Sequence, residues 1–193
     1  MDFPKKFQLL IEKHLEFCGY SLKDPAPLAK AILNLSTRYQ NLENKPSVWN
    51  SLDDTAAYIA YFFPLNYLRA RRAWQKCKEV GFPSSKRFID FGAGCGTMSL
   101  ALLDTFGQDC ELLLVDQSTK ALSIAQDFLP IKALTFTDIK DLDFTSCNLG
   151  LSYSLNELSQ LPQDFDKSNN ILFIEPSTQT ESRHLMKLRK GLK

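Results

Sequence analysis

The chain has 193 residues, 44% of them hydrophobic and 23% charged, and its formal net charge is +1. This balance is ordinary for one globular domain with an extension, and it lacks the strong positive charge of a dedicated nucleic-acid-binding tail. No apolar run reaches the roughly 18 residues that a membrane-spanning helix requires. The first residues contain no signal-peptide core, and the five cysteines are scattered without a Cys-x-x-Cys pair. We therefore expect reduced thiols, a cytoplasmic location, and neither a disulfide framework nor a zinc site.

The first part of the chain, residues 1–82, is predicted to be a helical extension. Apolar residues recur at helical spacing in three segments, which are residues 7–17, 25–42 and 51–82. We expect Ser51 to cap the third helix and Pro64 to kink it, because proline lacks the N–H that continues a helix. Gly81 is predicted to end that helix.

The second part, residues 83–193, is predicted to be an α/β domain. Five short apolar runs alternate with helical patterns, and the predicted strands are residues 87–91, 111–116, 133–138, 148–154 and 171–176. The predicted helices between and after them are residues 97–107, 118–129, 155–161 and 179–193, with Ser118 as an N-cap. Strands that are apolar on both faces and separated by helices indicate a doubly wound, mainly parallel, Rossmann-like sheet.

Three glycines, Gly92, Gly94 and Gly96, lie between the first predicted strand and its helix. Glycine inside regular structure costs roughly 0.5–1 kcal/mol relative to alanine, so three of them indicate that something approaches the backbone closely. In a parallel sheet, the turn after the first strand is where ligands bind, and we expect the glycines to leave room for a cofactor. Position 97 is threonine, so the spacing fails the Gly-x-Gly-x-x-Gly pattern of dinucleotide-binding proteins, which disfavours nicotinamide-dependent redox chemistry.

The stretch from Asp90 to Gly96 resembles motif I, Asp-x-Gly-x-Gly-x-Gly, of the class I S-adenosylmethionine-dependent methyltransferases. Asp116 and Asp138 close the next two predicted strands. The resemblance implies S-adenosyl-L-methionine as the cofactor, with Asp90 serving its cationic end, Asp116 its ribose hydroxyls and Asp138 its adenine amino group. The predicted cofactor-binding residues are Asp90, Phe91, Gly92, Ala93, Gly94, Gly96, Asp116, Gln117, Asp138 and Ser152.

Three further stretches narrow the resemblance, namely Ala57–Pro64, Ser152–Leu158 and Glu175–Thr178. In their order along the chain they resemble the methyltransferase-like family of the mitochondrial small ribosomal subunit and its bacterial relatives, over roughly residues 52–190. Ser177 stands where that family usually shows glycine. The resemblance implies small-subunit ribosomal RNA or the ribosome as a partner. The family's C-terminal cysteine cluster has no counterpart here, so we assign no metal ligands.

The residues after the fourth predicted strand are the candidates for the acceptor side of the site. Tyr153, Asn156 and Glu157 are expected at the strand end that faces the methyl group, as catalytic candidates. The segment lacks the Asn/Asp-Pro-Pro-aromatic pattern typical of enzymes that methylate base nitrogens in nucleic acids. Cys95 and Cys147 lack the Pro-Cys context of cytosine carbon methyltransferases, so neither is predicted to be a nucleophile.

Three functions stay open from the sequence. The first is an S-adenosylmethionine-dependent methyltransferase acting on ribosomal RNA or a ribosome-associated substrate. The second is a non-catalytic ribosome-assembly or RNA-binding factor that retains the cofactor fold, and the third is a small-molecule methyltransferase. Basic residues at two places could follow RNA phosphates or merely face solvent; they are Arg69, Arg72, Lys76, Lys187, Arg189, Lys190 and Lys193.

The last predicted strand raises a question about the edge of the sheet. Class I methyltransferases continue the sheet with a sixth and a seventh strand, whereas about 17 residues follow the fifth strand here. We expect either a truncated form or a sheet that ends early. An unpaired edge strand invites association, so residues 170–175 are predicted to be covered by the N-terminal helices or paired with a second copy in a homodimer.

Overall fold

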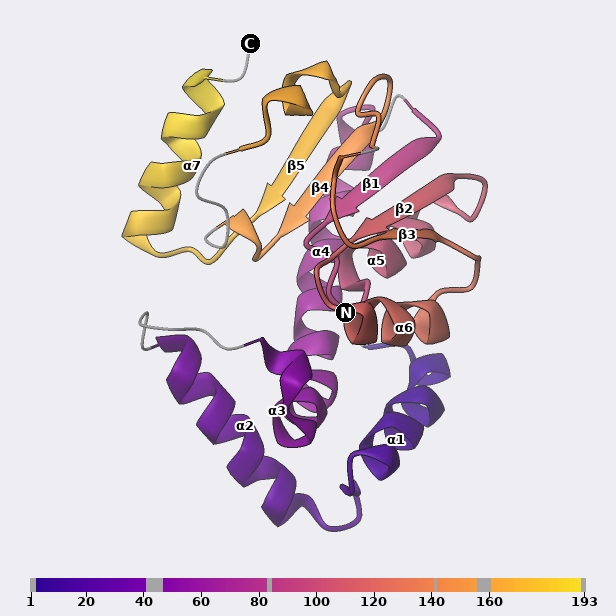
Figure 1. The fold of residues 1–193 in the computed structure, drawn as a ribbon, viewed down its shortest axis with the longest axis vertical. Helices are drawn as coiled ribbons and strands as arrows, with labels where there is room; N and C mark the ends of the chain where they lie inside the picture. The colour runs from indigo at the N-terminus through magenta and orange to yellow at the C-terminus, as the bar shows by residue number, and fades with distance from the viewer. Residues whose placement is uncertain (1–2, 41–46, 83–84, 141, 156–160, 192–193) are drawn as a thin grey trace. The chain divides into compact units, whose positions relative to one another are not determined.

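A computed structural model of the chain describes residues 3–40, 47–82, 85–140, 142–155 and 161–191. The chain divides into two compact units, Met1–Arg69 and Ala70–Lys193, which are described separately (Figure 1). This division falls inside helix α4 (Phe63–Glu79), ahead of the boundary expected at residue 82. The second half of α4 belongs with the sheet, because the Trp74 indole nitrogen donates to the Met98 carbonyl at 3.1 Å. Within the described residues, none of the helices combines the length and the apolar character that crossing a membrane would take.

The first unit is helical, as predicted. Its elements in chain order are η1 (Lys5–Phe7), α1 (Gln8–Phe17), α2 (Pro25–Gln40), η2 (Val48–Asn50), α3 (Leu52–Ala57), η3 (Tyr58–Phe62) and the beginning of α4. Buried apolar side chains recur at helical spacing along these elements and form its core; they include Phe7, Ile11, Leu15, Leu28, Leu35, Ile59 and Phe63.

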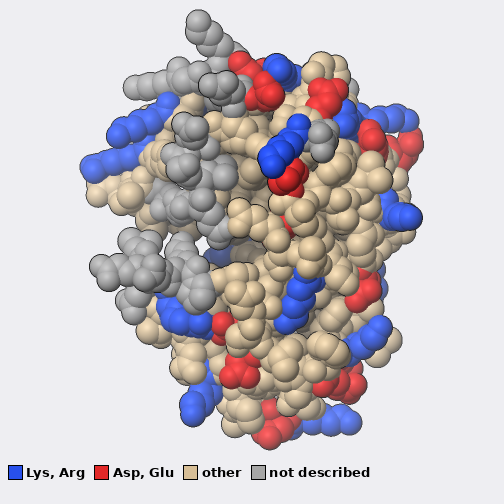
Figure 2. All heavy atoms as spheres, viewed as in Figure 1, with Lys and Arg blue, Asp and Glu red and all other residues tan. Residues whose placement is uncertain are grey.

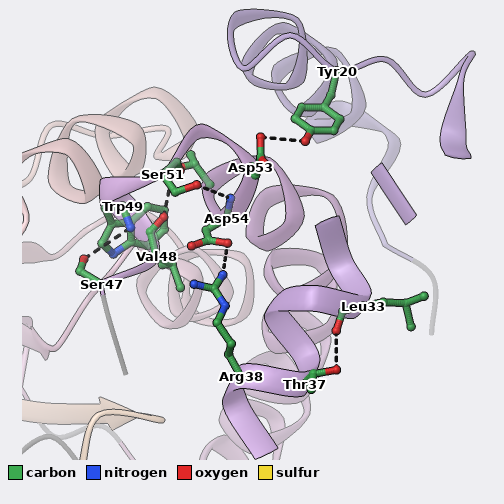
Figure 3. Close-up of polar contacts among 11 residues, drawn as sticks. Tyr20, Leu33, Thr37, Arg38, Ser47, Val48, Trp49, Ser51, Asp53 and Asp54 are labelled. Atoms are coloured by element: carbon green, nitrogen blue, oxygen red, sulfur yellow. Dashed lines mark hydrogen bonds and ion pairs between the residues drawn. The ribbon is translucent and has the colours of Figure 1, made fainter. Parts of the chain in front are cut away.

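Polar contacts tie α2, and the segment before it, to α3 in this unit (Figure 3). The Ser51 hydroxyl accepts from the Asp54 N–H at 3.3 Å, which confirms the predicted N-cap of α3. The Asp54 carboxylate pairs with the Arg38 guanidinium of α2, so the acid serves a tertiary contact. The Tyr20 hydroxyl donates to the Asp53 carboxylate at 2.9 Å.

Pro64 is accommodated by a change of helix type. The five residues of η3 form a π-helical turn, and the Phe63 N–H donates to the Tyr58 carbonyl five residues earlier. A π turn is one way for a helix to absorb a residue that cannot continue the regular hydrogen-bond ladder. The helix therefore continues through the proline into α4.

The second unit is built on a five-stranded parallel sheet with the order β3-β2-β1-β4-β5 (Figure 1). The strands are β1 (Arg87–Phe91), β2 (Glu111–Val115), β3 (Leu134–Phe136), β4 (Asn148–Ser152) and β5 (Asn170–Ile174). The remaining elements are α5 (Thr97–Phe106), α6 (Thr119–Phe128), η5 (Gln163–Lys167) and α7 (Gln179–Gly191). The predicted α/β class is confirmed, and the order matches the first five strands of a doubly wound, Rossmann-like sheet.

Both faces of the sheet are covered, which explains why its strands read as continuous apolar runs. On one face, Trp74 of α4 packs edge-on against Phe88 of β1 and Phe106 of α5, with ring centroids 5.4 and 5.9 Å apart. On the other face, Ile89 belongs to a buried cluster with Phe165 of η5. The sheet reverses its winding between β1 and β4, and the carboxyl ends of these two strands are the expected position for a ligand.

Candidate functional site

The site is organised around the loop of residues 92–96, which joins β1 to α5. Gly92, Gly94 and Gly96 all have positive φ, at 69°, 52° and 73°. Residues with a side chain pay roughly 1–2 kcal/mol in this left-handed region, so the backbone path itself selects glycine. The N–H groups of Gly92 and Ala93 both donate to the Val115 carbonyl at 2.9 Å. The loop is thereby held to the carboxyl end of β2.

Two of the three glycines also make room for other parts of the chain. A Cβ on Gly92 would lie 2.4 Å from the Ser154 Cβ, and one on Gly96 would lie 3.1 Å from the Ala125 Cβ of α6. The segment after β4 and the helix α6 therefore approach the loop closely at these positions. Gly92 and Gly96 therefore lack a side chain because other parts of the chain pack against them, whereas the glycines were expected to leave room for a cofactor. For Gly94 that expectation stays a prediction.

Asp116 follows β2 directly and points at the glycine loop. One oxygen of its carboxylate accepts from the Gly94 N–H at 2.8 Å, and the other accepts from the Ser118 N–H at 2.8 Å. Ser118 in turn caps α6, since its hydroxyl accepts from the Ala121 N–H at 3.2 Å. Asp116 is half-buried. The carboxylate thus joins the loop after β1 to the start of α6.

Asp90 lies beneath the loop, with a side chain that is almost fully buried. Its Oδ2 accepts from the Ser99 N–H at 3.1 Å and from the Ser99 hydroxyl at 2.5 Å, whereas its Oδ1 is buried without a hydrogen-bond partner in the described structure. Burial raises the pKa of Asp90 to about 6; the Ser99 hydrogen bonds act in the opposite direction, and the nearby Asp116 adds to the increase. A buried carboxylate oxygen without a partner is costly to the fold.

The end of β4 lies against the same loop. The Ser154 hydroxyl donates to the Phe91 carbonyl at 3.0 Å, next to Gly92. Tyr153, one residue earlier, has a φ of 59°, and its N–H donates to the Ile174 carbonyl of β5 at 2.8 Å. A bulky residue in the left-handed region is strained, and such strain concentrates at functional sites. Tyr153 therefore stays a candidate for the acceptor side of the site.

Three residues that the sequence analysis did not assign hold these parts in place. They are Ser99, which binds Asp90; Ser154, which contacts Gly92; and Glu175, whose carboxylate accepts from the Leu155 N–H at 3.0 Å. Ser99 was detectable as the polar residue in the otherwise apolar stretch of residues 98–103. Glu175 lies in the Glu-Pro stretch already singled out by the family resemblance. Asn156 and Glu157, two of the catalytic candidates, lie outside the described residues.

Asp138 is placed differently from the other two acids. It does not close β3, which ends at Phe136, and its side chain is exposed. Its carboxylate accepts from the N–H of Lys140 at 3.0 Å, in a local turn. In the described structure no hydrogen bond joins it to the glycine loop, so the prediction that Asp138 binds adenine has no geometric support of this kind.

The remaining predicted cofactor-binding residues lie in or near the loop, and their side chains differ in how far they are exposed to solvent. The Phe91 ring packs edge-on against Phe165, 5.1 Å between centroids, so this residue reaches the loop only through its backbone. Ala93 is buried, Ser152 is half-buried at the end of β4, and Gln117 is exposed. The structure thus brings together the glycine loop, Asp90 of β1, Asp116 after β2, and the end of β4.

Two buried cysteines, Cys95 in the loop and Cys147 before the first residue of β4, are in an environment unsuited to nucleophiles. Burial raises the pKa of the Cys95 thiol well above its ordinary value, and burial also raises the pKa of Cys147. Both side chains therefore stay protonated at neutral pH, which agrees with the expectation that neither is a nucleophile. Among the described residues, no group of three His, Cys, Asp or Glu side chains is arranged to hold a metal ion.

Comparisons with known proteins give weak similarities only. No family model matches the chain, and no curated protein matches it at a significant level. Among solved structures, the candidate RNA methyltransferase PH1948 from Pyrococcus horikoshii has 14% identity and a TM-score of 0.48, covering 83% of this chain and 80% of that one. The plantazolicin methyltransferase BpumL, in complex with SAH, has 18% identity and a TM-score of 0.38, covering 77% and 49%. SAH-bound methyltransferase PaMTH1 from Podospora anserina has 13% identity and a TM-score of 0.31, covering 78% and 59%. Similarities this low do not assign a function, and the fold class rests on the sheet itself.

Proposed function

We propose that the chain is an S-adenosylmethionine-dependent methyltransferase of class I. The observation that carries the proposal is the Asp116 carboxylate turned onto the Gly94 N–H, in the loop after β1, the strand beside which the sheet reverses its winding. A nucleoside cofactor with a cationic amino acid end can be bound by acids that accept from its ribose hydroxyls and its amino group. Asp90 near the end of β1 and Asp116 after β2 provide such acids at the carboxyl ends of these strands.

The residues present fit such a cofactor. An ionised carboxylate has about four acceptor sites, and Asp116 uses two of them for backbone amides, so two remain for ribose hydroxyls. Gly94 lets the ligand approach the backbone, and the resemblance to motif I assigns Asp90 to the cationic amino acid end. When bound, the cofactor supplies a methyl group on a sulfonium, and the protein contributes binding and orientation of the acceptor.

For the methyl acceptor we propose ribosomal RNA or a ribosome-associated substrate, in the cytoplasm. Support comes from the exposed side chains of Arg183, Lys187 and Arg189 on α7, where basic side chains gather at the upper left of Figure 2. Such cations attract phosphates independently of sequence. The resemblance of Ser152–Leu158 and Glu175–Thr178 to the ribosomal methyltransferase-like family supports the same substrate class.

A second candidate function is a ribosome-assembly factor that binds the cofactor without turnover. The observation in its favour concerns the described segment after β4: residues 153–155 contain no histidine or carboxylate, and the Glu175 carboxylate beside them already accepts from the Leu155 N–H at 3.0 Å. An acceptor that must lose a proton would require such a base nearby. A methyl acceptor whose nitrogen already carries a free lone pair would not require a base.

Two measurements test the proposal. Isothermal titration with S-adenosylmethionine and with its demethylated product should show binding of both, and titration with a nicotinamide dinucleotide should show none. Absence of binding of either nucleoside would refute the proposed cofactor. Transfer of a tritiated methyl group to small-subunit ribosomal RNA then separates the two candidates, because binding without incorporation would support the assembly factor.

A further inference from the structure

The chain leaves the strand conformation abruptly at the carboxyl end of β4. β4 and β5 lie side by side, and their parallel register pairs Ser152 with Ile174 as the last residues of the two strands (Figure 1). The Tyr153 N–H still donates to the Ile174 carbonyl at 2.8 Å, but Tyr153 itself has a φ of 59°. A left-handed residue changes the direction of an extended chain. The residues after Tyr153 therefore leave the hydrogen-bond ladder of the sheet.

The next two residues, Ser154 and Leu155, are both buried where the chain turns. Ser154 is 5% exposed and packs against Gly92, and its hydroxyl donates to the Phe91 carbonyl at 3.0 Å. Leu155 is 1% exposed. A buried backbone N–H without an acceptor destabilises a fold, so the Leu155 N–H requires a partner outside the ladder.

Glu175 provides that partner. Its Oε1 accepts from the Leu155 N–H at 3.0 Å, and a hydrogen bond to a carboxylate is stronger than one between neutral groups. Glu175 directly follows the last residue of β5, and Pro176 comes next. Proline restricts the residue before it to extended conformations, so the backbone of Glu175 has little freedom. The carboxylate is thus presented from a fixed point at the end of β5.

We propose that Glu175 is a positioning residue for the acceptor side of the site, a role that rests on the proposed function. It holds residues 153–155 in the turn that places them against the glycine loop. Strained backbone such as that of Tyr153 persists only where its surroundings fix it. Of the three hydrogen bonds named above, two come from the end of β5, through the Ile174 carbonyl and the Glu175 carboxylate, and the third goes to Phe91.

The glycine loop has supports of its own, which separates the expected effect of Glu175 from that of Asp116. The loop is tied to the end of β2 through the Val115 carbonyl and the Asp116 carboxylate. Loss of the Glu175 carboxylate should therefore displace the acceptor segment, while the dissociation constant for S-adenosylmethionine changes less than about threefold. Methyl transfer depends on orientation of the acceptor, and a misplacement of about 1 Å can lower its rate about 100-fold.

Hydrogen exchange resolved to single amides tests the contact. Glu175→Ala should lower the protection of the Leu155 amide by at least about tenfold, because a hydrogen bond to a charged group is lost. Glu175→Gln keeps a side-chain carbonyl and should retain the protection within about threefold. Asp143→Ala is the matched control, since it removes a carboxylate that accepts from the Thr145 N–H at 2.8 Å, and it should leave Leu155 unchanged. Equal protection of Leu155 in Glu175→Ala and in the unmodified protein would refute the proposal.

Methyl transfer to small-subunit ribosomal RNA tests the role. We expect the turnover number of Glu175→Ala to fall by at least about tenfold and that of Glu175→Gln to stay within about threefold of the unmodified chain. If Glu175→Gln is as inactive as Glu175→Ala while Leu155 stays protected, the carboxylate itself is required and the positioning role is wrong. Where circular dichroism shows that the alanine variant does not fold, the glutamine variant decides alone. An unmodified chain that transfers no methyl group would refute the proposed function, whereas the Leu155 exchange would still decide whether Glu175 holds the segment.

Discussion

The carboxyl ends of β1 and β2 differ from that of β3, although each has an aspartate nearby: Asp90 within β1, Asp116 directly after β2 and Asp138 two residues after β3. Asp90 and Asp116 are held by hydrogen bonds from the loop and helices around them, and Asp116 contacts the glycine loop directly. Asp138 follows a strand of three residues, is exposed, and bonds to its own turn. The same residue type at the same kind of position is thus part of the candidate site in two cases and of a local turn in the third.

An acid at a strand end therefore becomes part of a site only when neighbouring segments place hydrogen-bond donors beside it. Val115 and Asp116 are tied to the loop by three hydrogen bonds, two to the carbonyl and one to the carboxylate. The end of β3 is one strand further from the loop, since β2 lies between them. The variants below probe this difference, from the largest expected effect to the smallest.

Gly94→Val changes the loop residue whose N–H donates to Asp116. Valine is β-branched and strained at a φ of 52°, and its side chain would occupy the space at the loop. We expect S-adenosylmethionine binding to be lost in isothermal titration while the fold persists by circular dichroism. Affinity equal to that of the unmodified chain would contradict the assignment of the loop as a cofactor site.

Asp90 should make the free energy of unfolding depend on pH. Its pKa in the folded protein is about 6, above the ordinary 3.8, so the folded state binds a proton more tightly than the unfolded state. This contribution to stability is fully present below about pH 4 and is lost as the pH rises through about 6. A shift of this size corresponds to roughly 3 kcal/mol.

The neutral variant Asp90→Asn isolates that contribution from those of other groups. Denaturant unfolding should show the variant gaining stability relative to the unmodified protein as the pH rises from 4 to 8. A difference between the two proteins that stays constant over this range would show that Asp90 ionises like an exposed acid.

Asp116→Asn tests the acid that contacts the loop. The amide keeps the shape but removes the charge and one acceptor, and hydrogen bonds to charged groups contribute roughly 1.5–3 kcal/mol. We expect the dissociation constant for S-adenosylmethionine to rise by about 10- to 100-fold. An unchanged dissociation constant would show that Asp116 does not bind the ribose hydroxyls.

Asp138→Asn is the matched substitution at the end of β3. Because the side chain is exposed and asparagine can keep the local turn, we expect the dissociation constant to change less than about twofold and the melting temperature to stay within about 1–2 °C. A loss as large as that of Asp116→Asn would restore the predicted adenine role. It would also show that cofactor binding draws the turn after β3 toward the site.

Much of the fold could be predicted because its signals are local. Apolar runs of strand length separated by amphipathic segments placed all five strands, and Ser51 and Ser118 were identified as helix caps from residue type and position alone. The third strand was predicted too long, because Thr137 and Asp138 continue the run in sequence while the chain already turns there. The π-helical turn before Pro64 was not foreseen, since a proline signals disruption without specifying its form.

The sequence predicted the position of the site, but it did not predict the contacts between the segments that form it. The glycine pattern and Asp116 mark the loop, but nothing near Gly92 in the sequence indicates that Ser154, 62 residues later, requires its missing side chain. The same holds for Glu175, which reaches back to the Leu155 N–H. Such contacts join residues that are distant in sequence, and they form only when the sheet aligns the strand ends.

The sequence by itself determined which segments are strands and helices and which loop is rich in glycine, because periodicity and residue type act over a few residues. Only the tertiary structure decided that Asp116 turns toward that loop and Asp138 away from it, and that an apolar strand ends the sheet. These outcomes depend on strand order and strand length, which are set by packing between segments far apart in the chain.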